Sequence, residues 1–110
     1  MRNTDVVRAS FQAYRAQDRD AADRLLADDF VFTSPQDDHI SKAEFLEKCF
    51  PTADRFRSQE ILQLVSAGED GVFIMYEYEL ETGGRYRNTE FITVRGGQLT
   101  ETQVFFGGRV

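Results

Sequence analysis

The spacing of apolar side chains divides the chain into a helical first half and a second half made of strands. Within residues 4–16, apolar groups recur every three or four positions, which places them on one face of a helix. Asp20 can cap a second helix, and Ser41 opens a third in a Ser-x-x-Glu capping box. Pro51 ends this third helix, because proline cannot continue the hydrogen-bond ladder of a helix.

The second half of the chain alternates between apolar and polar positions, which is typical of strands. A short strand before the third helix and four longer ones after it are predicted at residues 30–33, 59–67, 72–81, 86–94 and 98–106. Gly96-Gly97 is a good two-residue turn between the last two strands. Helices followed by an antiparallel meander indicate an α+β fold, and residues 1–110 suit a single domain.

Several of the predicted strands carry apolar side chains on both faces. Tyr76 and Tyr78 share one face of their strand, while Phe73 and Met75 share the other. One face can accept the helices and a pocket, and the second must also be covered, because large exposed apolar patches are uncommon on monomers. We therefore expect a homodimer that forms through the backs of two sheets.

Charge and composition narrow the classes of partner. The formal net charge is −6, and an acidic chain repels nucleic-acid phosphates and anionic lipid, so neither nucleic acid nor a membrane is expected as a partner. Ten Phe and four Tyr residues favour a pocket for a small apolar molecule, although a Phe-rich core without a ligand would use the same rings. The lone Cys49 and the lack of a signal-peptide pattern lead us to expect a cytoplasmic protein.

Three segments resemble the nuclear transport factor 2-like superfamily, and within it the SnoaL-like and ketosteroid-isomerase-like branch. They are residues 27–35 (Ala-Asp-Asp-Phe-Val-Phe-Thr-Ser-Pro), 95–99 (Arg-Gly-Gly-Gln-Leu) and 105–107 (Phe-Phe-Gly). The element order matches over nearly the whole chain. The resemblance implies a conical α+β barrel, in which a curved antiparallel sheet carries the three helices of the N-terminal half on its concave face. It also implies a pocket at the wide end and a dimer.

The resemblance does not extend to the catalytic residues of ketosteroid isomerases. Those enzymes place a general-base aspartate before the proline that ends the first strand, and two donors that stabilise the oxyanion. The matching positions here are Ser34, Ser10 and Thr89. Because serine cannot act alone as the base at neutral pH, we expect no ketosteroid isomerase activity.

Aligned on this family, the chain has a pocket wall of aromatic rings with scattered hydroxyl groups. The residues expected to bind the substrate are Tyr14, Phe32, Ser34, Tyr76, Tyr78, Phe91, Thr102 and Phe106. Such a wall can hold a mostly apolar molecule and orient a few of its polar atoms. For Tyr76 and Tyr78, core packing is an equally good interpretation.

Asp38 and His39 form the one acid–base pair visible in the sequence and are the candidate catalytic residues. Histidine titrates near neutral pH, and a neighbouring carboxylate can fix its tautomer. A solvated loop before a helix would contain the same residue types, because acidic side chains favour helix N-termini.

Glu90 is a second acid–base candidate, which depends on the strand register. If the register shifts by one residue, Asn88 and Glu90 face the pocket in place of Thr89 and Phe91. A glutamate among aromatic rings would have a raised pKa. An outward-facing Glu90 is the alternative that fits the usual exposure of glutamate.

No metal or other cofactor is expected. One His and one Cys make a poor ligand set, and the glycine pairs lie in hairpin turns rather than at the start of a helix. We therefore expect either a cofactor-free acid–base enzyme or a non-catalytic domain for ligand binding or dimeric interaction. An enzyme would be of isomerase, cyclase or lyase type, acting on an apolar, polyketide-like or steroid-like substrate.

Overall fold

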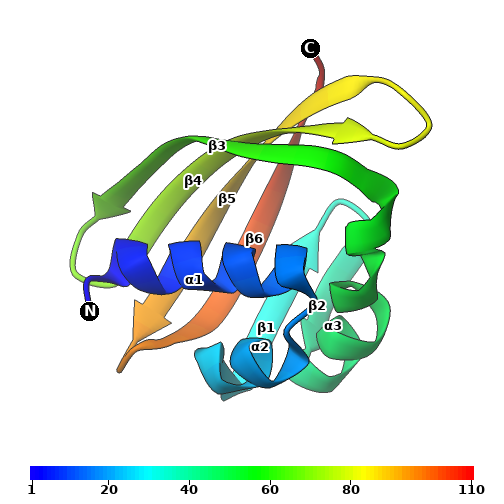
Figure 1. Cartoon of the computed structure of the whole chain (residues 1–110). Helices are drawn as coiled ribbons and strands as arrows, with labels where there is room; N and C mark the ends of the chain where they lie inside the picture. Colours follow the sequence, from blue (N-terminus) through cyan, green and yellow to red (C-terminus); the bar gives the residue numbers. More distant parts are fainter.

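A six-stranded sheet curves around one long helix in the structure, a computed structural model that describes all residues 1–110 (Figure 1). The strands are β1 (Leu26–Ser34), β2 (Asp37–Ser41), β3 (Phe56–Ala67), β4 (Gly71–Leu80), β5 (Arg85–Arg95) and β6 (Gln98–Arg109). The helices are α1 (Asn3–Ala16), α2 (Arg19–Leu25), α3 (Lys42–Lys48) and the 3-10 helix η1 (Phe50–Arg55). The α+β fold and its three helices are as the sequence predicts.

The sheet is mixed, in the order β2-β1-β6-β5-β4-β3, and it does not close. β1 runs parallel to β6, with Phe32 opposite Thr102, whereas the other neighbouring strands are antiparallel. The expectation of a purely antiparallel sheet is therefore wrong at this one pairing, because a hydrophobic pattern does not record strand direction. The segment that contains Asp38 and His39 forms a short edge strand, β2, which pairs with β1.

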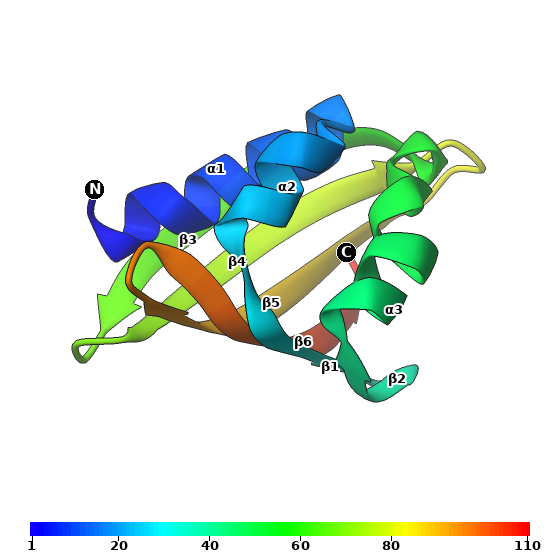
Figure 2. The ribbon, with the colours of Figure 1, turned by 90° about the horizontal axis from the view of Figure 1, so that it is seen from below.

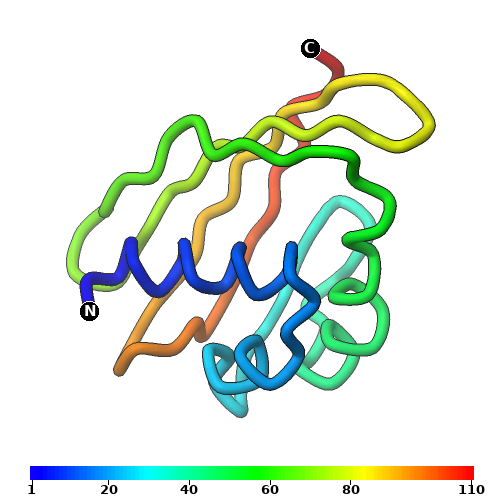
Figure 3. Tube along the Cα trace, in the orientation of Figure 1, coloured from blue at the N-terminus to red at the C-terminus, as the bar shows by residue number.

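The helices cover the concave face of the sheet, as Figure 2 shows from below. α1 crosses in front of the strands (Figure 3) and buries Val6 and Val7 completely, together with Ile74 of β4. Ser41 caps α3 as expected, accepting a hydrogen bond from the backbone N–H of Glu44 at 3.2 Å. α2 begins earlier than expected, because Asp18 caps it in place of Asp20. No helix is long and apolar enough to cross a membrane.

An irregularity in β6 decides which of its side chains face the helices. Val94 lies opposite Leu99 while Thr93 lies opposite Glu101, so one extra residue sits in β6 between these pairs. Leu99 and Thr102 consequently both face inward, although they are three residues apart. The inner face of β6 thus supplies both apolar and polar groups to the interior.

Candidate functional site

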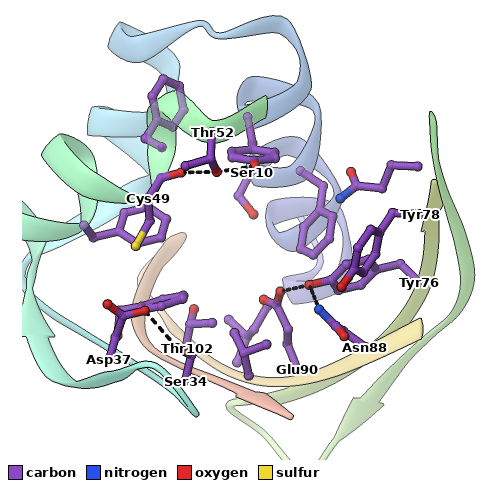
Figure 4. A pocket seen from close by; sticks show the side chains of 18 of the residues that line it. Ser10, Ser34, Asp37, Cys49, Thr52, Tyr76, Tyr78, Asn88, Glu90 and Thr102 are labelled. Atoms are coloured by element: carbon purple, nitrogen blue, oxygen red, sulfur yellow. Dashed lines mark hydrogen bonds between the residues drawn. The ribbon is translucent and has the colours of Figure 1, made fainter. Parts of the chain in front are cut away.

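A cavity of about 590 Å³ lies between the concave face of the sheet and the helices (Figure 4). Aromatic rings form one of its walls. The Phe11 ring from α1 meets Tyr76 edge-on with ring centroids 5.1 Å apart, and the Phe56 ring meets Tyr78 in the same way at 5.1 Å. These rings make a largely apolar enclosure that suits a flat, apolar molecule.

Glu90 is a carboxyl group at the floor of this cavity. It points inward from β5, is only 9% exposed, and shares its face with Asn88. Phe91 lies on the opposite face, where its ring packs on Phe73 with centroids 4.7 Å apart. The placement of Thr89 and Phe91 in the pocket is therefore wrong, and the register that turns Asn88 and Glu90 inward is the one observed.

Tyr76 holds the Glu90 carboxyl group, and Asn88 in turn holds Tyr76. The Tyr76 hydroxyl donates a hydrogen bond to Glu90 Oε2 at 2.6 Å, and Asn88 Nδ2 donates to the Tyr76 hydroxyl oxygen at 3.4 Å. The antiparallel pairing of β4 and β5 sets this chain of bonds, because it places Tyr76 directly opposite Asn88. Glu90 Oε1 has no partner within the protein and is not sealed from the cavity.

The environment of Glu90 suits it to proton transfer at neutral pH. Burial raises the pKa of Glu90 to about 7, and the hydrogen bond from Tyr76 partly opposes this rise. Burial and the nearby Glu90 charge raise the pKa of Tyr76, so the phenol keeps its proton and remains a donor. A carboxyl group with a pKa near 7 is present in both protonation states at neutral pH and can accept or release a proton.

The polar side chains across the cavity from Glu90 are bound to one another. Ser34 donates to Asp37 Oδ2 at 2.8 Å. Tyr14 donates to Thr52 Oγ1 at 2.7 Å, since the Thr52 hydroxyl itself donates to the backbone oxygen of Cys49 at 2.7 Å. Burial raises the pKa of Tyr14 to about 12 and that of the Cys49 thiol to about 11. Both groups therefore stay protonated at neutral pH and do not offer a base.

The sequence model of the SnoaL-like domain family matches residues 7–102 of the chain. The chain belongs to this family. No curated protein sequence matches the SnoaL-like chain.

Solved structures share the fold of this SnoaL-like domain. A protein from Kribbella flavida DSM 17836 superimposes with a TM-score of 0.82 at 23% identity, over 93% of this chain and 84% of that one. A second Kribbella flavida protein, named provisionally as a ketosteroid isomerase, superimposes with a TM-score of 0.80 at 18% identity, over 94% of this chain and 76% of that one. A Sinorhizobium meliloti protein, named provisionally as a polyketide cyclase, superimposes with a TM-score of 0.80 at 19% identity, over 92% of this chain and 94% of that one. At these identities the likeness shows the fold alone.

The SnoaL-like domain keeps Asp38 and His39 outside the cavity lining. His39 Nδ1 lies 2.7 Å from Asp38 Oδ1, so the two side chains contact each other. Their side chains, however, are 96% and 67% exposed respectively, on the edge strand β2. The neighbouring Asp37 lines the cavity instead. The two adjacent side chains therefore contact each other, but neither of them points into the cavity.

Most of the expected binding residues of the SnoaL-like domain do line the cavity. Those that do are Tyr14, Phe32, Ser34, Tyr76, Tyr78, Thr102 and Phe106. Phe91 is the exception, and the part each of the others plays in binding remains a prediction. Phe50, Phe56 and Tyr86 also line the cavity, and no sequence pattern indicated this, because they lie at the ends of elements where periodicity is lost. No three His, Cys, Asp or Glu side chains are grouped as metal ligands.

Proposed function

We propose that this SnoaL-like domain is a cofactor-free acid–base enzyme of isomerase, cyclase or lyase type that acts on a small, largely apolar molecule. The observation that supports this most directly is Glu90, a buried carboxyl group whose free oxygen faces the cavity beside Tyr76. The aromatic walls suit a polyketide-like or steroid-like ring system. Two structural neighbours carry such activities in their provisional names, which agrees with the proposal.

In the proposed reaction, Glu90 acts first as a base and then as an acid. Its carboxylate accepts a proton from a substrate carbon, and the electron pair of that C–H bond stays on the substrate. The neutral acid then returns the proton, to the same atom or to another one. The Tyr76 hydroxyl stabilises the carboxylate and fixes its orientation, while the enclosing rings limit access of water. The cycle consumes no co-reactant.

A non-catalytic binding domain is the second candidate function. It is favoured by the way the aromatic rings pack on one another. Tyr78 stacks on Tyr86 with centroids 5.7 Å apart and lies 6.1 Å from Tyr76. Rings that pack in this way form a preformed surface for an apolar ligand and require no chemistry from Glu90.

Proton exchange into solvent distinguishes the two candidates. We expect the protein to catalyse exchange of the α-protons of fused-ring ketones or 1,3-dicarbonyl compounds in D₂O, measured by loss of their proton NMR signals. Because the carboxylate is the active base, the rate at limiting substrate should rise with pH and level off above about 7, the raised pKa of Glu90.

The same assay tests the other acid–base candidate. Binding of these compounds without exchange at any pH would favour the non-catalytic domain. Loss of exchange in His39→Ala would assign proton transfer to the exposed Asp38–His39 pair and contradict the proposal. The His39 side chain is far more exposed than that of Glu90, so we expect this variant to exchange protons normally.

We further propose that two copies associate through the convex face of the sheet. Val65, Phe73, Met75 and Phe105 are between 37% and 53% exposed, and strand pairing links Met75 through Thr89 to Phe105. Sedimentation at micromolar concentration should give twice the 12.6 kDa chain mass, and Phe105→Glu should give the single-chain mass with an unchanged circular-dichroism spectrum. A wild-type chain that sediments as a monomer at every concentration would contradict the dimer.

A further inference from the structure

Most hydroxyl groups around the cavity already donate a hydrogen bond within the protein, but one buried hydroxyl does not. Protein acceptors already bind the protons of Ser10, Tyr14, Ser34, Thr52 and Tyr76. Thr102 is only 4% exposed and lines the cavity, yet its hydroxyl makes no hydrogen bond within the protein. This hydroxyl is not among the side-chain atoms sealed inside the protein, so a molecule in the cavity can reach it.

A buried hydroxyl without a partner is unusual and points to a partner from outside the chain. Buried polar groups are nearly always hydrogen-bonded, because an unpaired one costs roughly 1–3 kcal/mol. The Tyr78 and Tyr86 hydroxyls also lack hydrogen bonds of good geometry, but these two side chains are less buried than Thr102, and their rings stack on each other. Thr102 is therefore the buried donor that the cavity leaves unused.

Thr102 and Glu90 lie on the same face of two neighbouring strands. Glu90 of β5 is opposite Val104 of β6, and Thr102 is opposite Ile92, which makes Glu90 and Thr102 diagonal neighbours. Figure 4 shows both side chains pointing into the cavity. A donor hydroxyl and the Glu90 carboxyl group thus face the same part of the cavity from neighbouring strands.

We propose that Thr102 binds the substrate by donating a hydrogen bond to an acceptor oxygen close to the atom at which Glu90 transfers a proton. The substrate is then a flat apolar ring system that carries a carbonyl or ether oxygen, with the rings against Phe11 and Tyr76 and the oxygen toward β6. The position of the proton-transfer atom rests on the function proposed for Glu90. The hydrogen bond from Thr102 itself does not require catalysis and is tested by binding alone.

Anisole and ethylbenzene are suitable probes, because they have nearly the same shape and differ by an ether oxygen in place of a methylene group. Their dissociation constants for the wild-type chain and for Thr102→Val are measured by NMR titration of the backbone amides. Valine keeps the shape of threonine and removes the donor. We expect the affinity ratio of anisole to ethylbenzene to fall about fivefold in Thr102→Val, the effect of one hydrogen bond, and to recover in Thr102→Ser.

Thr89→Val is the matched control, since it makes the same change on the outer face of β5 and should leave the ratio unchanged. Thr102→Ala is measured beside Thr102→Val, so that loss of the hydroxyl is tested even if one variant fails to fold. An unchanged ratio in the folded variant, or binding of neither probe to the wild-type chain, would overturn the role of Thr102. The affinity ratio could fall in Thr102→Val while the wild-type chain catalyses no proton exchange in D₂O. That pair of results would overturn the proposed function of Glu90 and leave the binding role of Thr102 intact.

Discussion

Replacing Glu90 with glutamine is expected to abolish proton exchange and, at the same time, to stabilise the folded chain above pH 7. Exchange is lost because the amide cannot accept the proton. Stability rises because the pKa of Glu90 is about 7 in the folded chain, whereas the ordinary value is 4.5. Below pH 4.5 the carboxyl group is neutral in both states, but above pH 7 the folded chain buries its charge at a cost of about 3 kcal/mol. Glutamine never carries that charge.

Urea unfolding of the wild-type chain and Glu90→Gln between pH 4 and pH 9 measures this effect. The difference in the free energy of unfolding should be smallest near pH 4, grow through the interval between 4.5 and 7, and stay constant above it. Glu69→Gln, at an exposed position in the turn after β3, should show no comparable growth. A difference for Glu90→Gln that does not change with pH would mean that the folded chain does not raise the pKa of Glu90.

Replacing Phe30 with alanine is expected to lower the free energy of unfolding by about 3–5 kcal/mol. Phe30 is 2% exposed, and its ring meets Phe45 of α3 edge-on with centroids 5.4 Å apart. The substitution removes the apolar contact between β1 and α3 and leaves a void that these elements can fill only partly. Urea unfolding at fixed pH gives the change.

Phe106→Ala is the matched control for this prediction. Phe106 also lines the cavity but is 50% exposed, so it buries much less surface on folding. It should therefore cost much less stability than Phe30→Ala. Equal losses in the two variants would show that the cavity wall formed by β1 is no better packed than its rim.

The helices and the long strands were predictable because their signals are local. A single apolar stripe over residues 4–16 and a serine followed three residues later by glutamate each specify a helix without reference to the rest of the chain. The parallel contact of β1 with β6 has no such signal, since it joins segments about seventy positions apart. Strand direction and neighbour order depend on how the whole chain returns to the sheet.

The inner face of β5 could not be decided from its sequence. One face carries Asn88 and Glu90, and the other carries Thr89 and Phe91. Glutamate is normally exposed and phenylalanine is normally buried, which favours the face with Phe91 as the inner one. Pairing with β4 settles the choice by turning the carboxyl group inward against Tyr76. The general preference for exposed glutamate therefore predicted the wrong face for Glu90, the residue to which we assign proton transfer.

The pairing of β1 with β6 also has a consequence for the order of folding. The hairpins of the meander β3–β6 close short loops, whereas β1 must find a strand that the chain makes last, and closing so long a loop is slow. The cavity needs Phe30 from β1 and Thr102 from β6 as well as Glu90. Ligand-binding ability should therefore appear only in the final stage of folding, after the hairpins have already acquired their hydrogen bonds.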